Sequence, residues 1–403
     1  MRIGIFTDMY YPYVSGLVTS IKMLYEGLEN LGHECYIFTS MDLAGHDNDP
    51  ELTEKRVINF DGIRYPFQVA KQYKFTPLLN KCAKQVKEYD LDIIHVQSEF
   101  GISLIARTAA EKYHIPIVHT LHTAWADYAC TIFPTLDKIN HPFCVWLMRN
   151  FLTMPNSKAA TLEILPTKKM LPRLKEYGIV HEHPEITPTG IELERFNYES
   201  VDEDEISALR DKLGLKDKFV FVYVGRIVSE KSVDFLVDAY AKGFKDRDDV
   251  RFLIVGDGWS GDEVRKQAHD LGLDGKVIFT GEVEWEDVPM YYHLGDVFIC
   301  ASMSETQGLT YIEAMASGLP NIVKKDPCID GVIKDGENGY LFDTEEEMIE
   351  KMNYVLDHRE ELGPLSEKAV ETSLLYSKEA FARNVLRIYE KAIDIYKNDG
   401  QDH

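Results

Sequence analysis

Short apolar runs alternate with longer amphipathic stretches along the whole chain. In the first half, the amphipathic stretches repeat apolar residues every three or four positions, which is the spacing of a helix with one buried face. The apolar runs predict strands at Ile3–Phe6, Glu34–Phe38, Ile93–Val96, Pro116–Thr120 and Glu185–Thr187. The amphipathic stretches predict helices at Ser20–Leu31, Leu78–Glu88 and Ile102–Tyr113.

The second half of the chain repeats this rhythm. The pattern predicts strands at Phe219–Val224, Arg251–Val255, Lys276–Phe279 and Val297–Cys300. It predicts helices at Val233–Lys242, Gly261–Leu271, Val288–His293 and Leu309–Ser317. Because strand and helix alternate in both halves, we expect parallel, doubly wound sheets. The fold class is therefore α/β, with two Rossmann-like domains.

The boundary between the domains is expected near Pro188-Thr189-Gly190-Ile191, where a strand ends shortly before an acidic segment. We therefore divide the chain into an N-terminal domain of residues 1–190 and a C-terminal domain of residues 191–377. The remaining residues, 378–403, contain a long predicted helix, Lys378–Tyr396. The sequence does not fix its place, and crossing back to the N-terminal domain is one option.

The net charge and the composition of the chain limit the classes of function that it can have. The chain has 403 residues, 45% of them hydrophobic, and a net charge of −23, which argues against a nucleic-acid-binding protein. Residues 1–200 carry only −4 of this charge, so an anionic surface would have to meet the first half. The cysteines are scattered, as in a reduced cytoplasmic protein, and neither a signal peptide nor an apolar run of spanning length is evident.

The most informative motif places one carboxylate before a predicted helix and a second one turn into it. Glu305 precedes Gln307-Gly308-Leu309-Thr310, and Glu313 follows inside the helix. The N-terminus of a helix offers unpaired N–H groups to an anion, and flanking carboxylates can accept sugar hydroxyls, so the motif suits a nucleotide sugar. The alternative is an ordinary helix whose Glu313 is solvated.

Two cations follow another predicted strand. Arg226 and Lys231 lie in the segment Gly225–Lys231, after Phe219–Val224 and before a helix. Open α/β sheets bind ligands at the carboxyl ends of their strands, where two fixed cations could stabilise a departing diphosphate. The alternative is a surface arginine beside a weak Glu230–Lys231 ion pair.

Further candidates lie in the first half. His122 follows the strand Pro116–Thr120 and could reach a sugar or a phosphate, although a core histidine bonded to the backbone is the alternative. Gly16 opens the first helix and would let the backbone approach a ligand. Neither this loop nor Gly256-Asp257-Gly258 completes the GxGxxG fingerprint, so NAD is not supported, and no metal-ligand spacing is evident.

Taken together, these motifs resemble glycosyltransferase family 4, a group of retaining enzymes with the GT-B fold of two facing Rossmann-like domains. The positions that carry the resemblance are, in order along the chain, Gly16, the His122 loop, Pro188–Ile191, Gly225–Lys231 and the pair Glu305 and Glu313. Within the family, the chain is similar to bacterial 1,2-diacylglycerol 3-α-glucosyltransferases. Gln307-Gly308, where many family members have Phe-Gly, carries much of that similarity.

The resemblance implies roles for individual residues. Arg226 and Lys231 would neutralise the donor's diphosphate, Glu305 would hold hydroxyls of the transferred sugar, and Glu313 would hold the ribose. His122 would lie beside the sugar as a further catalytic residue. Additional donor contacts would come from Gly16, Gln307, Gly308, Leu309 and Thr310. No cofactor and no metal is then required, because the two cations stand at the leaving group.

A lipid acceptor would require contact with a membrane surface. Lys71, Lys74, Lys81, Lys84 and Lys87 form one basic stretch, and residues 141–175 mix aromatic residues with cations. Such a surface suits an anionic leaflet, although the lysines could equally be the solvated face of a helix. The candidate acceptor or membrane residues are Asp8, Lys81, Lys84, Trp146, Arg149, Lys168 and Lys169.

The sequence thus predicts a cytoplasmic or peripheral enzyme that transfers glucose from UDP-glucose to diacylglycerol. Because the chain is strongly acidic, weak or reversible membrane association is expected. The alternative is a family 4 enzyme with a soluble sugar, glycan or hydroxy-acid acceptor. A non-catalytic nucleotide-sugar-binding protein would require a defect in Arg226, Lys231 or Glu305, and none is seen. The missing glycine fingerprint counts against an NAD-dependent dehydrogenase. The donor sugar and the oligomeric state are not determined by the sequence.

Overall fold

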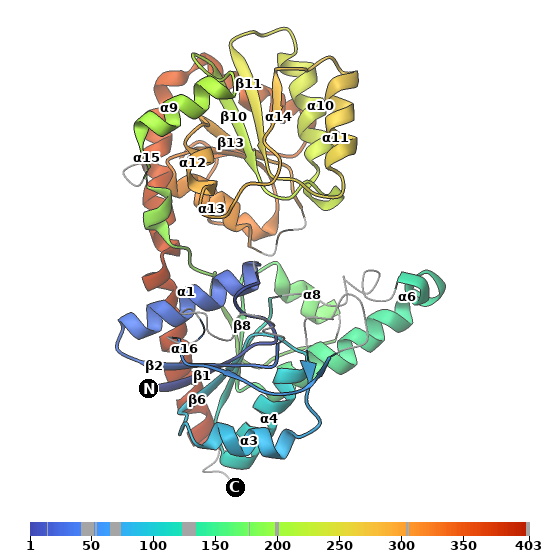
Figure 1. Cartoon of the computed structure of the whole chain (residues 1–403), viewed down its shortest axis with the longest axis vertical. Coiled ribbons are helices and arrows are strands. Elements are labelled where there is room, and N and C mark those ends of the chain that lie inside the picture. Colours follow the sequence, from blue (N-terminus) through green and yellow to red (C-terminus); the bar gives the residue numbers. More distant parts are fainter. Residues whose placement is uncertain are drawn as a thin grey trace. The chain divides into compact units, whose positions relative to one another are not determined.

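The computed structural model contains two compact units. It describes residues 1–13, 15–41, 52, 55–64, 74–122, 134–176, 178–197, 201–303, 305 and 307–399. Unit 1 consists of Met1–Gly190 together with Lys378–His403, and unit 2 consists of Ile191–Ser377 (Figure 1). The chain therefore leaves unit 1 once, forms unit 2, and returns with its last helix.

Unit 1 is built on a parallel sheet. Its described strands are ordered β3-β2-β1-β6-β7-β8-β9, so the chain first adds strands to one side of β1 and then to the other. The strands are β1 (Arg2–Phe6), β2 (Glu34–Thr39), β3 (Val57–Asn59), β6 (Ile93–Val96), β7 (Ile117–Thr120), β8 (Leu162–Leu165) and β9 (Pro184–Ile186). A separate antiparallel pair joins β4 (Ile63–Arg64) to β5 (Lys74–Phe75).

Helices cover both faces of this sheet. One core cluster joins buried residues of α1 and α16 to the strands, and another joins those of α3 and α4 to the opposite face. The helices of unit 1 are α1 (Gly16–Asn30), α3 (Leu79–Lys87), α4 (Gly101–Tyr113), α6 (Pro134–Met148), the π-helix η3 (Arg149–Thr153), α7 (Met154–Ala159), α8 (Met170–Glu176) and α16 (Lys378–Asp399).

Unit 2 repeats the plan with the strand order β12-β11-β10-β13-β14-β15. Its central strand β10 (Phe219–Val224) is buried along its whole length, as expected for a strand covered on both faces. The other strands are β11 (Val250–Val255), β12 (Val277–Phe279), β13 (Val297–Cys300), β14 (Asn321–Lys324) and β15 (Gly339–Phe342). The α-helices are α9 (Glu203–Lys212), α10 (Val233–Phe244), α11 (Gly261–Asp270), α12 (Val288–Tyr292), α13 (Leu309–Ala316), α14 (Glu345–Asp357) and α15 (Leu362–Ser373).

Short 3-10 turns complete the described elements of unit 2. They are η4 (Leu193–Phe196), η6 (Ser229–Lys231), η7 (Pro327–Ile329), η8 (Arg359–Glu361) and η9 (Leu374–Tyr376). The predicted α/β fold class is confirmed, and the predicted strands β6, β10 and β13 have the bounds that the sequence indicated. The sheet strands β3, β8, β14 and β15 were not predicted from the sequence, and of these β3 and β15 lie at sheet edges.

The last helix, α16, packs against α1 in unit 1. Gly27 lies at the contact, where an added Cβ would stand 2.6 Å from the Cβ of Ala382 and 2.9 Å from the carbonyl oxygen of Lys378. Lys378 also pairs with Glu26 at 3.3 Å. Because the neighbouring atoms belong to the backbone and first carbon of α16, the two helices can approach this closely only with glycine at position 27.

We therefore expect Gly27→Val to destabilise unit 1 by about 1–3 kcal/mol, the usual cost of overpacking a core. The matched control is Gly363→Val in α15, because a Cβ at Gly363 meets no described atom within 4 Å. Thermal and urea unfolding should show a lower midpoint for the first variant than for the second. Equal midpoints would mean that α16 does not need this close approach.

Candidate active site

The predicted cation Lys231 and the predicted carboxylate Glu305 lie together in unit 2. The ammonium group of Lys231 contacts Oε1 of Glu305, and both side chains are largely buried. The contact arises because β10 and β13 are neighbours in the sheet, so the loops that follow them leave the same edge. The Glu230–Lys231 pair considered from the sequence is not the one that forms, since Glu230 instead lies 4.0 Å from Arg226.

The loop that carries Arg226 is held by its backbone. The hydroxyl of Tyr223 donates to the carbonyl oxygen of Arg226 at 3.0 Å, and the N–H of Ile227 donates to the carbonyl oxygen of Asp257 at 2.9 Å. A Cβ on Gly256 would stand only 2.2 Å from the carbonyl oxygen of Gly225. The glycines after β11 thus allow two loops to pack, while the guanidinium of Arg226 stays exposed.

The start of α13 has the geometry that the motif predicted. Gly308 has φ +76°, and a Cβ there would stand 2.3 Å from the ring of Tyr311, so glycine is required for this turn. Leu309 and Thr310 then form the first turn of α13, where backbone N–H groups have no partner within the helix. Gln307 is buried directly before this turn.

Glu313, one turn into α13, is not a solvated surface residue. Its Oε2 accepts a hydrogen bond of 2.8 Å from the hydroxyl of Tyr292. Burial raises the pKa of Glu313, while the hydrogen bond from Tyr292 and the charge of Arg195 act in the opposite direction. Burial and the neighbouring Glu313 raise the pKa of Tyr292 well above its usual value, so this hydroxyl remains a donor. The solvated alternative for Glu313 is therefore wrong.

In unit 1, His122 contacts a side chain from the neighbouring strand end. Its Nε2 lies 2.5 Å from Oε1 of Gln97, which follows β6 just as His122 follows β7. Burial, together with the charge of His119, lowers the pKa of His122 to about 3, so its imidazole is neutral near pH 7. The alternative in which the backbone satisfies a core histidine is not what the structure shows.

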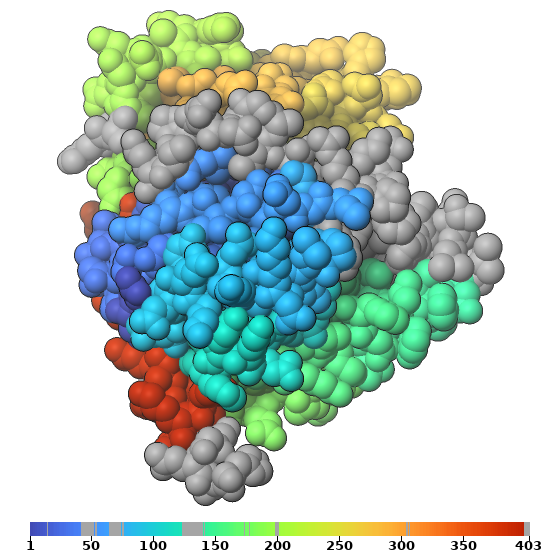
Figure 2. Space-filling model, turned by 60° about the horizontal axis from the view of Figure 1, so that its bottom comes forward, coloured from blue at the N-terminus to red at the C-terminus, as the bar shows by residue number. Residues whose placement is uncertain are grey.

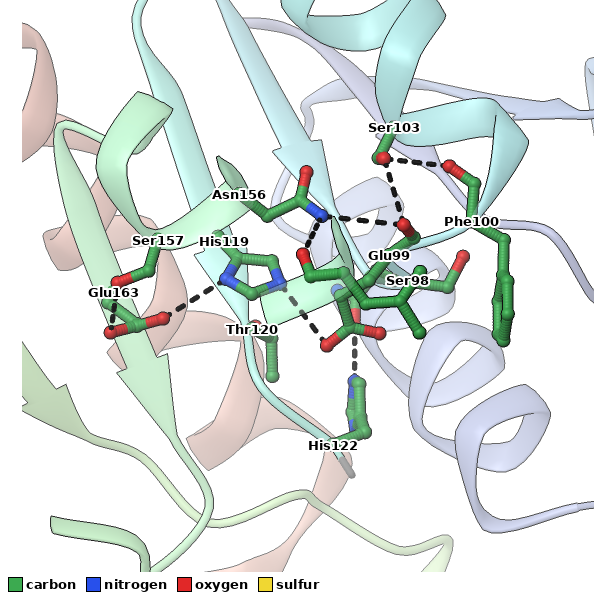
Figure 3. A network of polar contacts seen from close by, with 12 residues as sticks. Ser98, Glu99, Phe100, Ser103, His119, Thr120, His122, Asn156, Ser157 and Glu163 are labelled. Carbon is green, nitrogen blue, oxygen red and sulfur yellow. Dashed lines mark hydrogen bonds and ion pairs between the residues drawn. The ribbon is translucent and has the colours of Figure 1, made fainter. Parts of the chain in front are cut away.

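Behind His122 lies a buried histidine between two carboxylates. Nδ1 of His119 is 3.1 Å from Oε1 of Glu163, and Nε2 is 3.5 Å from Oε1 of Glu99 (Figure 3). His119 and Glu163 are register partners on β7 and β8, and the hydroxyl of Ser157 donates to the second oxygen of Glu163 at 3.1 Å. Burial opposes protonation, but the hydrogen bond to Glu163 and the charges of both carboxylates prevail and raise the pKa of His119 to about 9.

Sequence reasoning missed His95, Gln97, Glu99, His119 and Glu163, all of which are buried. Polar side chains inside or directly after apolar strands were the available signal, because a buried polar group needs a partner. The partners lie on neighbouring strands that are distant in sequence, and so the pattern alone could not pair them.

Two further N-terminal candidates differ in their surroundings. Gly16 is the first residue of α1, and a Cβ there would meet no described atom within 4 Å, which leaves room beside the helix N-terminus. Asp8, expected on the acceptor side, is instead buried and caps α4. Its carboxylate accepts hydrogen bonds of 3.0 Å from Phe100 N and Ile102 N and of 2.7 Å from the Ser98 hydroxyl. Asp8 therefore has a structural role, because its carboxylate already holds the start of a helix.

The remaining acceptor candidates lie on the surface of unit 1. Lys81 and Lys84 are on the exposed face of α3, whose other face buries Cys82, Ala83 and Val86 in the core. Figure 2 looks onto a side of the molecule on which α3, in light blue, and α6 with η3, in green, are both visible. Lys168 is exposed and Lys169 is half-buried.

Exposed aromatic rings gather on α6 and η3. Trp146 is stacked on Phe143 at 5.8 Å between ring centroids and meets Phe151 edge-on at 6.3 Å. The three residues are 49%, 43% and 63% exposed, respectively. Arg149, in contrast, is half-buried, and its guanidinium lies beside Gly178, where an added Cβ would stand 3.2 Å from it.

Some predicted positions lie outside the described residues, namely Ser304 and Thr306 of the carboxylate motif and Lys71 of the basic stretch. Across the described ranges, no helix is long and apolar enough to cross a bilayer. Within the same ranges, histidine, cysteine and acidic residues do not gather in groups of three or more that could hold a metal ion.

Comparison with known proteins identifies the family. The protein-family model described as "Glycosyltransferase Family 4" matches residues 14–195, and the family model described as "Glycosyl transferases group 1" matches residues 205–372. The α-monoglucosyldiacylglycerol synthase of Acholeplasma laidlawii is 35% identical over 98% of both chains. The chain belongs to glycosyltransferase family 4. The synthase of the same name from Streptococcus pneumoniae is 34% identical over 98% of this chain and 86% of its own length.

Solved structures agree on the fold of this family 4 glycosyltransferase. The Anabaena protein HepE, in complex with UDP and glucose, superposes with a TM-score of 0.71 over 97% of this chain and all of its own, at 20% identity. The GT-B architecture predicted from the sequence is thereby confirmed, and the chain is a hexosyltransferase.

The extra proton on His119 should make the stability of the folded protein depend on pH. The pKa of His119 is about 9 in the fold and about 6.5 in an unfolded chain, so the folded state binds the extra proton between these values. The stabilisation is complete below about pH 6.5 and is lost as the pH rises through about 9.

The melting temperature of the wild type should therefore fall more steeply over this pH range than that of His119→Gln. His269→Gln is the matched control, because His269 is an exposed histidine beside Asp274. Differential scanning fluorimetry at constant ionic strength measures all three proteins. Parallel pH profiles for the wild type and His119→Gln would show that His119 is not charged in the folded protein.

Proposed function

We propose that this family 4 glycosyltransferase transfers glucose from UDP-glucose to 1,2-diacylglycerol with retention, giving α-monoglucosyl diacylglycerol. The observation that carries the proposal is the contact between Lys231 and Glu305 at the edge where β10 and β13 end. We propose that this cation binds the diphosphate and that the neighbouring carboxylate binds sugar hydroxyls. Near-full-length similarity to two α-monoglucosyldiacylglycerol synthases supports this choice of donor and acceptor.

In this proposal, unit 2 holds the donor. Lys231 and the exposed Arg226 face the diphosphate, and the first-turn N–H groups of Leu309 and Thr310 add hydrogen bonds to it. Glu305 accepts from hydroxyls of the glucose, and Glu313 accepts from the ribose. Because Lys231 and Glu305 contact each other without substrate, each charge is already compensated, and the bound donor would exchange this contact for its own.

The proposed reaction depends more on positive charge beside the leaving group than on a side chain that acts as a general base. As the glycosidic bond breaks, negative charge grows on the departing phosphate oxygen, and Arg226 with Lys231 stabilises it. We propose that these cations supply the positive charge that a metal ion supplies elsewhere. The departing phosphate then helps to remove the proton of the acceptor hydroxyl on the same face of the sugar, while neutral His122 contacts the sugar.

For the acceptor, we propose a reversible contact of unit 1 with an anionic membrane surface on the cytoplasmic side. Phe143, Trp146 and Phe151 form an exposed aromatic cluster, which suits the headgroup region of a bilayer. Lys81 and Lys84 add positive charge on the exposed face of α3, and each such lysine contributes about 1 kcal/mol near an anionic leaflet.

The direct test is incubation of the purified protein with UDP-glucose and vesicles that contain diacylglycerol. Glucolipid should form, and the coupling constant of its anomeric proton should show the α-configuration that retention requires. Transfer to a soluble sugar, glycan or hydroxy acid without transfer to lipid would replace the proposed acceptor. A β-linked product would contradict retention.

Replacing either member of the ion pair should abolish most transfer. We expect Lys231→Ala and Glu305→Gln each to lower kcat by about 100- to 1000-fold, the usual effect of removing one preorganised group that stabilises the transition state. Lys266→Ala is the matched control, because Lys266 forms an exposed ion pair with Asp270 elsewhere in unit 2. Initial rates of glucolipid formation measure the effect, and a rate within about twofold of wild type for Lys231→Ala would refute its role.

Removing a ring of the aromatic cluster should lower transfer only when the acceptor lies in a membrane. Trp146→Ser is expected to weaken sedimentation with anionic vesicles and to lower transfer to diacylglycerol, while leaving slow hydrolysis of UDP-glucose unchanged. The control is Trp259→Ser, which removes a tryptophan of unit 2 that is 73% exposed. Equal losses of vesicle binding in both variants would show that exposure alone, not this surface, governs the contact.

A further inference from the structure

A chain of buried polar groups runs from the last helix to His122. Gln97, directly after β6, lies between His122 and His95, and all of its contacts are inside unit 1. His95 in turn contacts the hydroxyl of Tyr389 on α16 at 2.6 Å and that of Thr120 at 2.7 Å. The roles assigned to His122 above make no use of these groups.

The orientation of the Gln97 amide follows from its contacts. Its Nε2 lies 3.2 Å from both ring nitrogens of His95, a position over the ring rather than in its plane. The in-plane positions of that ring face Tyr389 and Thr120. The face of an aromatic ring attracts an N–H group and repels a carbonyl oxygen, so the NH₂ group belongs at His95 and Oε1 belongs at His122.

The state of His122 follows in turn. An amide oxygen can only accept, so the 2.5 Å contact between Oε1 of Gln97 and Nε2 of His122 requires a proton on that nitrogen. Burial and the positive charge of His119 lower the pKa of His122 to about 3, so the ring carries a single proton near pH 7. Nδ1 is then the hydrogen-bond acceptor of the ring.

We propose that Gln97 is a positioning residue that holds His122 in the Nε2–H tautomer, so that Nδ1 accepts a hydrogen bond from a hydroxyl of the transferred sugar. His95 contacts the amide of Gln97, and Tyr389 of α16 contacts His95, so α16 would support the orientation of His122 through these two residues. The part played by the sugar hydroxyl rests on the proposed function. The tautomer and its dependence on Gln97 are properties of the free protein.

The first test therefore needs no substrate. Proton–nitrogen correlation spectra of the ¹⁵N-labelled protein distinguish the two histidine tautomers, and His122→Asn identifies the His122 signals. The wild type should show the Nε2–H form, and Gln97→Leu should lose that preference. An Nδ1–H form in the wild type, or an unchanged tautomer in Gln97→Leu, would overturn the proposal.

The second test asks whether Gln97 acts through His122. We expect Gln97→Leu to lower kcat for glucose transfer by about tenfold with little change in KM. In a His122→Ala background, the same change at Gln97 should cost less than about twofold, because the residue it positions is gone. Equal losses in both backgrounds would show that Gln97 acts independently of His122.

Tyr389→Phe provides a variant that disturbs the chain of contacts without touching Gln97 or His122. It should lower kcat and weaken the tautomer preference in the same direction as Gln97→Leu, but by less. Tyr240→Phe is its matched control, since Tyr240 is also a buried tyrosine, with its hydroxyl on the carbonyl oxygen of Val250 at 3.0 Å. If no UDP-sugar were turned over, the proposed function would fail, while the spectra of the free protein would still decide the role of Gln97.

Discussion

In both units, the chain reverses the direction in which the sheet grows between two central strands. Unit 1 does so between β1 and β6, and unit 2 between β10 and β13. Because all of these strands are parallel, the loops that follow them emerge side by side although many residues separate them in sequence. Lys231 meets Glu305 by this rule, and Ser98 meets Asp8 in the same way. The candidate site depends on this strand order more than on any single contact.

The charged groups of the two units differ in their surroundings. In unit 1, His119 is enclosed by Glu99 and Glu163, and each charge in this group has an opposite charge beside it. Burying such charges costs desolvation free energy, which their attraction offsets only when the partners lie in suitable positions. Here the register of β7 and β8 aligns Glu163 with His119. In unit 2, Lys231 and Glu305 also compensate each other, but they lie at a loop edge, where a ligand can take the place of either partner.

The last helix, α16, packs in the core of unit 1 and also contributes a side chain to its buried polar network. Gly27 and Ala382 allow α1 and α16 to approach closely, and the hydroxyl of Tyr389 reaches His95 inside the polar chain behind His122. The last helix thus contacts the buried polar groups that lie beside His122. This arrangement explains why a helix that makes no predicted ligand contact is nevertheless integrated in the core.

Local patterns in the sequence were sufficient for much of the fold. The runs Phe219–Val224 and Val297–Cys300 are strands because their apolar, β-branched and aromatic residues suit a sheet covered on both faces. The turn at Gly308 was likewise predictable, since few residues other than glycine adopt its positive φ. The carboxylate motif and the loop after β10 could be named as candidates for the same reason, because each is a local pattern.

What the sequence by itself determined was therefore the set of elements, the alternation that implies parallel sheets, and the residues that carry charge at strand ends. Only the tertiary structure decided that Lys231 pairs with Glu305 rather than Glu230, that Asp8 caps α4, and that Gln97 lies between His95 and His122. The physical reason is the range of the forces involved. Hydrophobic periodicity and turn preferences act over a few residues, whereas a buried polar group takes its partner from whichever strand the sheet places beside it.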